Sequence, residues 1–286
     1  MEARAVTHTT RTNAVAALRK TGFSLTRSAR RQWRTKTAAL RPLPSFIIIG
    51  AQRSGTTSLY NWITQHPDVA PASQKELHYF DGSNYDRGER WYRSQFPIVS
   101  GRRRSCESTP QMLYNPVSPK YVAKDLPSST KFVVLLRDPV ERALSHYWLS
   151  RKNGAETEEI VTAFALERER LAREDEAFRA GRYSYAHHKF SYVARGDYAT
   201  QLARWFSCVD RDRMLVLESE RLFSDQDRRL TLTSWLGLDP LSAPIPSLNS
   251  APRSEIPLEL ISRLKEHFEP RNRQLFEMLG HPLWGQ

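Results

Sequence analysis

The chain has 286 residues, of which 40 % are hydrophobic and 26 % charged, a composition typical of a globular protein. This length suits one large α/β domain with insertions, or two small domains. No apolar run approaches the roughly 20 residues of a membrane-spanning helix, and the N-terminus lacks the apolar core of a secretory signal. The two cysteines, Cys106 and Cys208, cannot form a disulfide framework and lack metal-ligand spacing. We therefore expect a cytoplasmic setting and no metal site.

The positive charge is concentrated near the N-terminus. Residues 1–44 contain ten Lys or Arg and one acid, Glu2, which gives +9 of the net +12, so residues 45–286 carry only +3. We expect residues 1–44 to be a basic extension, flexible or partly helical, that precedes the folded domain. Such an extension either touches an anionic membrane weakly or stays in solvent. No recognisable nucleic-acid-binding module accompanies it, so we expect no specific nucleic-acid partner.

The segment 45–59, SFIIIGAQRSGTTSL, organises the rest of the chain. Its apolar run at 46–49 is rich in β-branched residues, which predicts a strand buried on both faces in a parallel sheet. Gly50 ends this strand, and apolar residues recur at helical spacing from Thr56 onward. The amides at the start of a helix have no internal acceptor, and the helix dipole favours negative charge there. The segment therefore predicts an anion-binding loop between a strand and a helix.

The loop differs from the nucleotide-binding pattern G-x-x-x-x-G-K-[ST] at one position. Gly50 and Gly55 have the required spacing, and Thr57 stands where the magnesium-binding hydroxyl would be. Thr56 replaces the lysine that ATP and GTP hydrolases need, and a cation is found earlier, at Arg53. This favours a phosphate site over a site for a nucleoside triphosphate with magnesium. A glycine turn that binds nothing is the alternative.

Residues 66–81, HPDVAPASQKELHYFD, contain turn-forming Pro, Asp and Ser residues that predict a loop rather than a helix or strand. Lys75, Glu76 and His78 lie near the end of this loop. A cluster of these residue types close behind a phosphate loop suits acid–base chemistry. A polar loop anchored by aromatic residues fits the same spacing equally well.

A second strand–loop–helix unit is predicted at 131–148, KFVVLLRDPVERALSHYW. Its apolar run at 132–136 predicts another buried strand, and Asp138, followed by a proline, predicts the start of a helix. Arg137 stands at the carboxyl end of the strand, where ligands bind in open α/β sheets, and Ser145 follows two helical turns later. Arginine with a hydroxyl can grip a phosphate, while a structural salt bridge of Arg137 is the competing interpretation.

A third apolar strand is predicted at 214–220, and the sequence contains no internal repeat and no linker between two cores. We therefore expect residues 45–286 to form a single α/β domain, with a central parallel sheet flanked by helices and a P-loop-like phosphate-binding loop.

The segment 182–198 interleaves aromatic and basic residues. It suits a surface for a sugar or an acidic substrate, or simply packing. Its adjacent histidines, His187 and His188, have no acid or cysteine at ligand spacing, so we do not expect a metal there.

Together these motifs resemble the sulfotransferases that use 3'-phosphoadenosine-5'-phosphosulfate (PAPS), in particular the carbohydrate or heparan-sulfate-type branch and its bacterial relatives. The resemblance rests on IIIGAQRSGTTSLYNWITQHPDV, KELHYFD, ESTP, RDPVERALSHYW and EHFEPRNRQLFEMLG, which are spread over most of residues 45–286. It implies a metal-independent transfer of a sulfuryl group from PAPS to a hydroxyl of a glycan, a glycolipid or a small molecule.

The resemblance also implies roles for individual residues. Arg53, Glu76 and His78 would be catalytic, with Glu76 as general base. PAPS would be held by Arg53, Ser54, Gly55, Thr56, Thr57, Ser58, Arg137 and Ser145.

The sequence departs from the family pattern at Ser108, where heparan-type enzymes carry a second functional lysine. The glycine-rich loop that covers the cofactor in the family is not evident here, and we expect its counterpart at 247–254. These departures leave the acceptor open.

Two other function classes remain alternatives at this stage. A kinase-like or regulatory nucleotide-binding protein with a degenerate P-loop would need magnesium, and the absent lysine argues against it. A non-catalytic adaptor with a basic tail would have no use for Glu76 together with Arg53.

Overall fold

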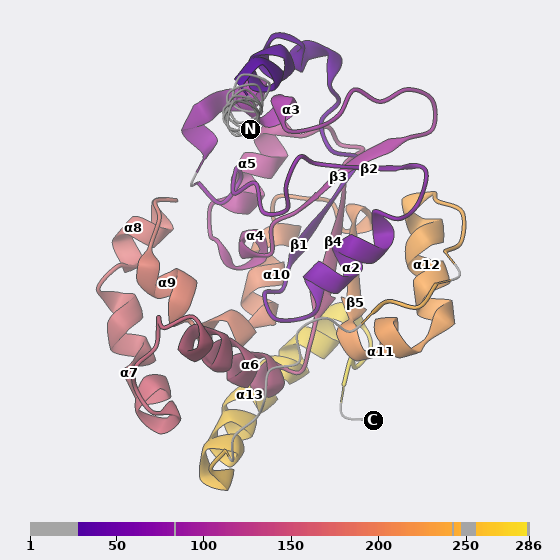
Figure 1. Ribbon diagram of the computed structural model, residues 1–286. Helices are drawn as coiled ribbons and strands as arrows, with labels where there is room; N and C mark the ends of the chain where they lie inside the picture. The colour runs from indigo at the N-terminus through magenta and orange to yellow at the C-terminus, as the bar shows by residue number, and fades with distance from the viewer. Residues whose placement is uncertain (1–27, 83, 242, 247–255, 285–286) are drawn as a thin grey trace, which may run out of the picture.

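Five parallel strands form the central sheet of the computed structural model, in the order β2–β3–β1–β4–β5 (Figure 1). The structure describes residues 28–82, 84–241, 243–246 and 256–284. The strands are β1 (Phe46–Gly50), β2 (Val69–Pro71), β3 (Arg104–Ser108), β4 (Lys131–Leu136) and β5 (Met214–Glu218). The predicted single α/β domain with a parallel sheet is confirmed.

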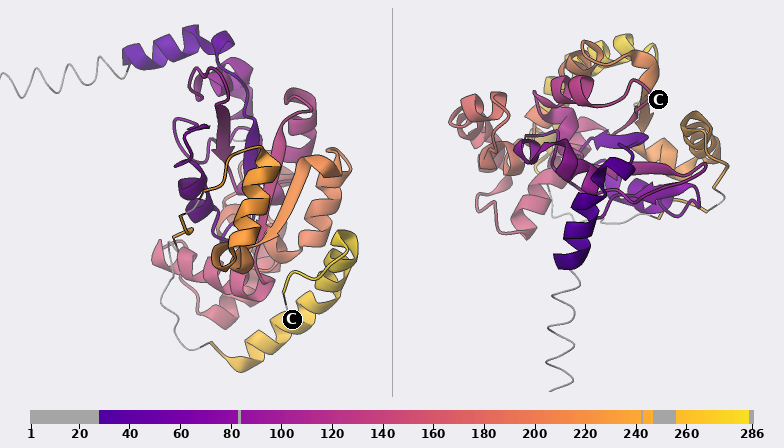
Figure 2. Two further views of the ribbon diagram at one scale, coloured as in Figure 1. Left: turned by 90° about the vertical axis from the view of Figure 1, so that its right-hand side faces the viewer. Right: turned by 90° about the horizontal axis from the view of Figure 1, so that it is seen from above.

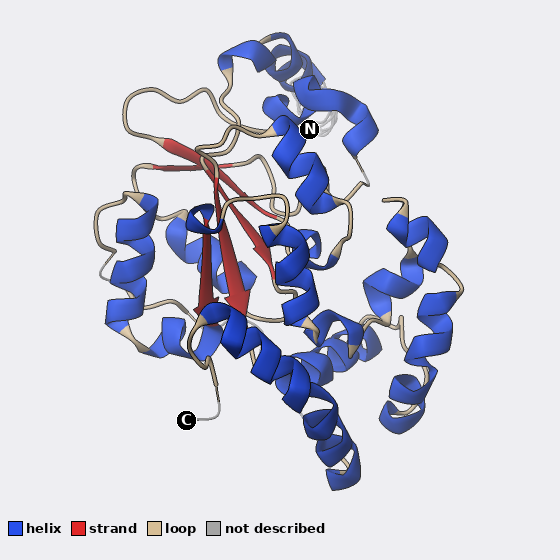
Figure 3. Ribbon diagram, turned by 180° about the vertical axis from the view of Figure 1, so that it is seen from behind, coloured by secondary structure: helices blue, strands red, loops and turns tan. Residues whose placement is uncertain are grey.

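Helices cover both faces of this sheet, as the blue ribbons on either side of the red strands show in Figure 3. They are α2 (Thr56–Ile63), α3 (Gly88–Ser94), α4 (Gln111–Tyr114), α5 (Ser118–Asp125), α6 (Pro139–Lys152), α7 (Ile160–Ala172), α8 (Asp175–Arg179), α9 (Tyr185–Lys189), α10 (Tyr198–Phe206), α11 (Ser219–Ser224), α12 (Gln226–Leu236) and α13 (Leu258–Leu279). Short 3₁₀ helices are η1 (Ala38–Leu40), η2 (Tyr85–Arg87), η3 (Ala194–Gly196) and η4 (Arg211–Arg213). None of the helices in the described residues combines the length and apolarity of a membrane span.

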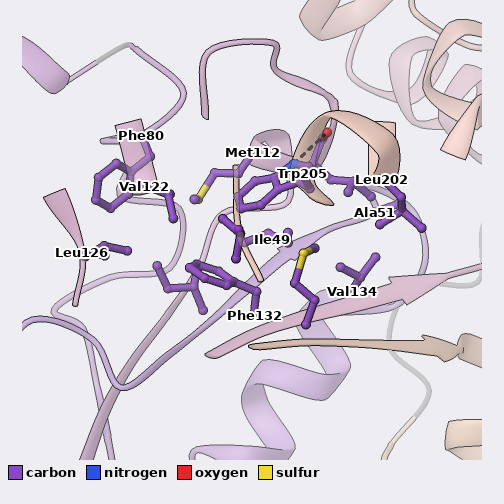
Figure 4. Close-up of a cluster of buried hydrophobic side chains, with 14 of the residues drawn as sticks. Ile49, Ala51, Phe80, Met112, Val122, Leu126, Phe132, Val134, Leu202 and Trp205 are labelled. Carbon is purple, nitrogen blue, oxygen red and sulfur yellow. Dashed lines mark hydrogen bonds between the residues drawn. The ribbon is translucent and has the colours of Figure 1, made fainter. Parts of the chain in front are cut away.

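The two faces of β1 belong to two different hydrophobic clusters. Ile49 packs in a cluster with Phe132 and Trp205, and Figure 4 shows these three side chains together. Ile48 points to the opposite face, where its cluster includes Trp62 of α2. Alternation between two buried faces requires apolar residues at every strand position, which is why β1 has an uninterrupted apolar run.

Two strands escaped the sequence prediction. The expectation that 66–81 is entirely a loop is wrong at β2, where Val69 pairs with Arg104 of β3. The strand has only three residues and ends in a proline, so it lacks a recognisable apolar run. β3 reads RSCES, yet every residue after Arg104 is buried. Polar residues form this buried strand because it leads into the carboxyl edge of the sheet, where the candidate site lies.

The N-terminal extension is helical at 28–36 and packs against α3, at the top of Figure 1. Arg34 Nε donates a hydrogen bond to the Ser94 carbonyl at 2.6 Å, and Arg41 Nη1 donates one to the Phe96 carbonyl at 2.5 Å. The part of the extension that the structure describes is therefore attached to the domain. The domain boundary at residue 44 stays a prediction.

Candidate active site

The carboxyl ends of the central strands bring the predicted site segments to one edge of the sheet. The amide of Thr109, just after β3, donates to the Ile48 carbonyl of β1 at 3.1 Å. The amide of Glu76 donates in turn to the Ser108 carbonyl at 2.9 Å. On the other side of β1, Ala51 donates to the Leu135 carbonyl of β4 at 2.6 Å. These bonds place the phosphate loop between the Glu76 loop and β4, which ends just before Arg137.

The phosphate loop depends on both of its predicted glycines. Gly55 caps α2 in the left-handed conformation, with φ 84° and ψ 14°. A Cβ at this position would lie 2.5 Å from Cζ of Phe223, and a Cβ on Gly50 would lie 2.5 Å from Cβ of Leu113. No larger residue fits at either end, so the predicted glycine-bounded loop is confirmed as a structural element. The loop leads directly into the first turn of α2, where backbone amides point toward the site.

Several side chains of the predicted PAPS-binding set are enclosed. Ser54, Thr56 and Ser58 are buried, whereas Arg53 and Thr57 are half-buried. The Ser54 carbonyl accepts a hydrogen bond from the hydroxyl of Ser219 at 2.9 Å, which attaches the loop to the start of α11. The loop is thus held in place from β5 and α11 as well as from β1.

Arg53 connects the two strand–loop–helix units. Its Nε donates to the Ser145 hydroxyl on α6 at 3.0 Å, across 92 residues of sequence. Burial lowers the pKa of Arg53, and the positive charges of Arg137 and Arg142 lower it further. Like charges held this close create a positive field that an anion would relieve. Ser145 is therefore at the predicted site, but its hydrogen-bond partner in this structure is Arg53 rather than Arg137.

Arg137 is engaged by carboxylates. Its Nη2 lies 3.1 Å from Glu141 Oε2, and its Nε lies 3.2 Å from Glu220 Oε1 on α11. Asp138 caps α6 by accepting hydrogen bonds from the amides of Val140 and Glu141, as its place before a proline predicted. Both interpretations of Arg137 are compatible with this geometry, because the ion pairs are formed at the edge where a ligand would bind. An anion would have to displace at least one carboxylate.

Glu76 is the centre of a chain of charged side chains. Lys75 Nζ contacts Glu76 Oε1, and His78 Nε2 lies 3.7 Å from Glu76 Oε2. The other ring nitrogen of His78, Nδ1, lies 2.5 Å from Asp81 Oδ2. The Asp81 side chain is only 1 % exposed, whereas that of Glu76 is 45 % exposed. The chain thus runs from the buried Asp81 to a glutamate that solvent can reach.

This arrangement fixes the charges of the pair at neutral pH. The hydrogen bond from His78 is the main cause that lowers the pKa of Glu76 to about 2; burial opposes this shift, and the charge of Lys75 lowers the pKa further. Burial would lower the pKa of His78, but its hydrogen bonds to Asp81 and Glu76 raise it to about 10. Glu76 is then a carboxylate and His78 an imidazolium. Such a carboxylate can accept a proton once a substrate displaces one of its cationic neighbours.

Backbone strain singles out the same residues. Within the described part of the chain, the residues other than glycine with positive φ are Arg53 at 73°, Glu76 at 62° and His78 at 51°. Each residue held in the left-handed region costs on the order of 1–3 kcal/mol, and such residues cluster at functional sites. The three residues identified as catalytic from the sequence are therefore the three strained ones.

Sequence reasoning missed one member of this cluster, Asp81, which was not selected at all. Lys75 was included in the predicted acid–base cluster but was given no role of its own. The signal for Asp81 was its position three residues after His78 in KELHYFD. The sequence could not predict the contact between Lys75 and Glu76, because adjacent residues in a loop can point in any direction.

The aromatic and basic segment 182–198 is mainly packing. His187 is buried, with Nδ1 2.9 Å from the Tyr114 hydroxyl and its ring stacked on Phe178. Arg195 is also buried and donates to Gln111 Oε1 at 2.6 Å. The exposed aromatic residues of the segment 182–198 are Tyr183 and Tyr185. Nowhere in the described ranges do three His, Cys, Asp or Glu residues gather as metal ligands would.

Comparisons with known proteins agree on one family. A family model described as "Sulfotransferase domain" matches residues 43–240. Human heparan sulfate glucosamine 3-O-sulfotransferase 3B1 is 29 % identical over 269 residues, covering 84 % of this chain and 64 % of the relative. Human heparan sulfate glucosamine 3-O-sulfotransferase 6 is 29 % identical over 272 residues, covering 86 % of this chain and 75 % of the relative.

A solved structure is similar over nearly its whole length. The sulfotransferase from Alicyclobacillus acidocaldarius has a TM-score of 0.70 at 26 % identity, with 85 % of this chain and 98 % of that chain covered. By contrast, the chain spans 64 % and 62 % of the first two curated relatives. The predicted cofactor-covering loop at 247–254 lies outside the described residues.

Proposed function

The chain belongs to the sulfotransferase family, and on this premise we propose that it transfers a sulfuryl group from PAPS to a hydroxyl of a carbohydrate, a glycolipid or a small-molecule acceptor. In this proposal Glu76 is the general base and Arg53 stabilises the transferring group. The observation that carries the proposal is the strained backbone at Arg53, Glu76 and His78. Left-handed backbone at three non-glycine residues near one sheet edge is the kind of strain that clusters at functional sites.

The donor side of the site fits an adenine nucleotide with phosphates at both ends of its ribose. The amides at the start of α2 and the guanidinium of Arg53 suit the 5'-phosphosulfate. Arg137 and Ser145, on the second unit, suit the 3'-phosphate. The charges of Arg137 and Arg142 lower the pKa of Arg53, so cations from both units meet at this edge and favour an anionic ligand.

The proposed chemistry follows from the charges. Glu76 takes the proton of the acceptor hydroxyl, and the acceptor oxygen bonds to sulfur as the bond from sulfur to the phosphate oxygen breaks. The leaving group is adenosine 3',5'-bisphosphate. Arg53 stays protonated throughout, so it acts electrostatically on the transferring group. His78 holds Glu76 in place through its own bond to Asp81 and moves no proton in the main step.

Lys75 has a part in this scheme because it occupies one oxygen of Glu76. A carboxylate with cations on both oxygens is a weak base, so the acceptor must displace Lys75 or draw its ammonium group away. His78 remains beside the other oxygen and fixes the orientation of the Glu76 carboxylate.

Cytoplasmic location and weak contact of residues 1–44 with anionic membranes stay predictions from composition and charge. A glycan acceptor is supported by the similarity to heparan sulfate glucosamine 3-O-sulfotransferases.

Isothermal titration calorimetry without magnesium tests the donor. Adenosine 3',5'-bisphosphate should bind about 10- to 100-fold tighter than 5'-ADP, since a charge-assisted contact contributes roughly 1.5–3 kcal/mol. Arg137→Ala should erase most of this difference and leave 5'-ADP binding nearly unchanged. Glu220→Gln should have the opposite effect and strengthen the binding of adenosine 3',5'-bisphosphate, because it removes a carboxylate that competes for Arg137.

Arg273→Ala, on the exposed side of α13, is the matched control and should change neither affinity. Equal affinities for the two nucleotides, or binding only with magnesium, would replace the proposal with the kinase-like alternative.

A further inference from the structure

Two aromatic rings extend the chain of charged side chains around Glu76. The ring centroid of His78 lies 6.1 Å from that of His188 on α9. The His188 centroid in turn lies 4.7 Å from that of Tyr183, in the connection between α8 and α9 at the left of Figure 1. Both distances lie within the usual range for contacts between rings. We call Tyr183 and His188 the aromatic platform.

The connection that carries Tyr183 is packed tightly against the end of the loop that holds the charged side chains. A Cβ on Gly82 would lie 1.8 Å from the carbonyl oxygen of Gly181, so the two backbones are in direct contact. Ser184 then begins α9, because its hydroxyl accepts a hydrogen bond from the His187 amide at 3.1 Å. The aromatic platform is therefore held in place from both of its ends.

The aromatic platform is open to solvent on the side of Tyr183. Tyr183 is 56 % exposed, whereas His188 is half-buried. The Glu76 side chain, at the other end of this row of residues, is 45 % exposed. A ring as exposed as that of Tyr183 contributes little to the core, but it offers apolar area to a molecule that approaches Glu76.

His188 differs in charge from His78. Burial lowers the pKa of His188 to about 3, and the positive charge of Arg195 contributes to this shift, so the ring is neutral at pH 7. His78 is an imidazolium held by Asp81 and Glu76. A neutral ring does not compete for the Glu76 carboxylate, and its face can contact an apolar surface without desolvating a charge. Apolar ring faces thus lie next to a charged base.

We propose that the aromatic platform binds a ring of the acceptor, so that the acceptor presents an apolar ring face beside the hydroxyl that Glu76 deprotonates. This inference rests on the proposed function and specifies its acceptor. A pyranose ring, with its C–H groups, and the aromatic ring of a phenol both provide such a face. Tyr183 and His188 contact this face and orient the hydroxyl toward Glu76, and an acyclic alcohol lacks the contact.

The neighbouring Tyr185 provides a matched control. It is 45 % exposed and lies two residues after Tyr183. Its ring centroid is 5.7 Å from that of Phe190, and the guanidinium of Arg170 on α7 lies 4.4 Å from the Phe190 centroid. Tyr185 therefore belongs to the contact between α9 and α7. Alanine at 183 and alanine at 185 remove the same side chain from similarly exposed positions, so a difference between them reports the location.

NMR titration of the full chain without donor tests this proposal. The first probe is maltohexaose, a neutral chain of glucose rings, and its control is the same chain after periodate cleavage and borohydride reduction, which open the rings and keep the hydroxyls. The second ring probe is 2-naphthol, a phenol. Maltohexaose should bind at least threefold tighter than its ring-opened form if the ring is a sugar, and 2-naphthol should bind if the ring is aromatic. If neither ring probe binds, the proposal is wrong.

Tyr183→Ala should weaken the ring probe that binds wild type by about three- to tenfold, the effect expected for one ring contact. Tyr183→Phe should stay within twofold of wild type, because it keeps the ring and removes only the hydroxyl. Tyr185→Ala should also stay within twofold. An equal loss in the two alanine variants, no loss in Tyr183→Ala, or a loss in Tyr183→Phe as large as in Tyr183→Ala would overturn the proposal.

Turnover assays separate this proposal from the proposed function. With PAPS as donor, Tyr183→Ala should raise KM for the ring acceptor by the same factor as it weakens binding and should leave KM for PAPS unchanged. Binding needs no sulfuryl transfer, so the two proposals fail separately. Ring binding that depends on Tyr183 supports the aromatic platform even if no sulfuryl group is transferred, whereas transfer with unchanged KM and binding in Tyr183→Ala overturns the platform alone.

Discussion

The donor side and the acceptor side of the candidate site are built differently. The donor side consists of loops that follow directly from β1 and β4 and enter α2 and α6, so its geometry is set by the sheet. The acceptor side, at Glu76 and His78, lies in a loop after the short edge strand β2 and is held by side-chain ion pairs and left-handed backbone. The geometry of the donor side depends on glycines and a helix cap, whereas that of the acceptor side depends on ion pairs.

This difference indicates where each side is vulnerable. Backbone shape decides the donor side, since added atoms at Gly50 or Gly55 would collide with neighbouring side chains. Charge balance decides the acceptor side, since Glu76 and His78 hold each other's pKa far from the usual values. Substitutions that change shape alone should therefore affect the donor, and substitutions that change charge alone should affect the acceptor step.

The largest effect is expected at the base. Glu76→Gln keeps the shape of the side chain but cannot accept a proton, so turnover should fall by about 10²-fold or more. Calorimetry should show nearly unchanged affinity for adenosine 3',5'-bisphosphate, because Glu76 lies on the acceptor side. Glu89→Gln, an exposed carboxylate on α3, is the control and should keep full turnover. Turnover of Glu76→Gln within a few-fold of wild type would move the base elsewhere.

The second prediction tests the donor side with shape alone. Gly55→Ala places a Cβ 2.5 Å from the Phe223 ring at φ 84°, so the loop must shift. We expect about tenfold weaker binding of the bisphosphate and a loss of stability of more than about 1 kcal/mol, since alanine at positive φ is strained as well. Gly154→Ala has the same strain, φ 69°, but open space around it.

The Gly154 variant should therefore lose only stability, in thermal melts, and keep its donor affinity. If both variants bind the bisphosphate equally well, the shape of the loop does not control the donor side.

The sequence predicted the donor side better than the acceptor side, for physical reasons. Strands buried on both faces need continuous apolar runs, and these revealed β1, β4 and β5. Helix N-termini need caps, and Asp138 before a proline revealed α6. Apolar runs and helix caps are both local sequence patterns, so they can be recognised without knowing the fold.

The remaining features depend on contacts between distant segments. The partner of Ser145 is Arg53, and a partner of Arg137 is Glu220, and neither pairing is encoded by spacing. Left-handed backbone could not be predicted at Glu76, because glutamate does not favour it, nor at His78, where the modest enrichment of histidine in this region is too weak to predict one position. β3 was not predicted because its buried residues are polar, and the packing of residues 28–36 against α3 was not predicted because the charge count treated that segment as a tail.

The smallest expected effect concerns the charge chain and appears as pH dependence. His78 has a pKa raised to about 10, so its contribution to stability is complete below its usual value of 6.5 and is lost as pH rises toward 10. Glu76, with a pKa lowered to about 2, contributes above its usual 4.5 and loses that contribution only as pH falls toward 2. Of this pair, therefore, only His78 makes the stability change with pH on the alkaline side.

Asp81→Asn removes the main hydrogen-bond acceptor that raises the pKa of His78, and it keeps the size of the buried side chain. Wild type should melt at progressively lower temperature between pH 6.5 and 10, and the variant should show a flatter dependence over the same window. Both curves are measured in a Glu107→Gln background, because the buried Glu107, with a pKa raised to about 8 by burial and in part by Asp81, titrates in the same window. The difference should be a few degrees, since each 1 kcal/mol shifts Tm by about 2–4 °C in a domain of this size. Parallel curves would mean that His78 is neutral in the folded protein and that Glu76 is held in place by Lys75 alone.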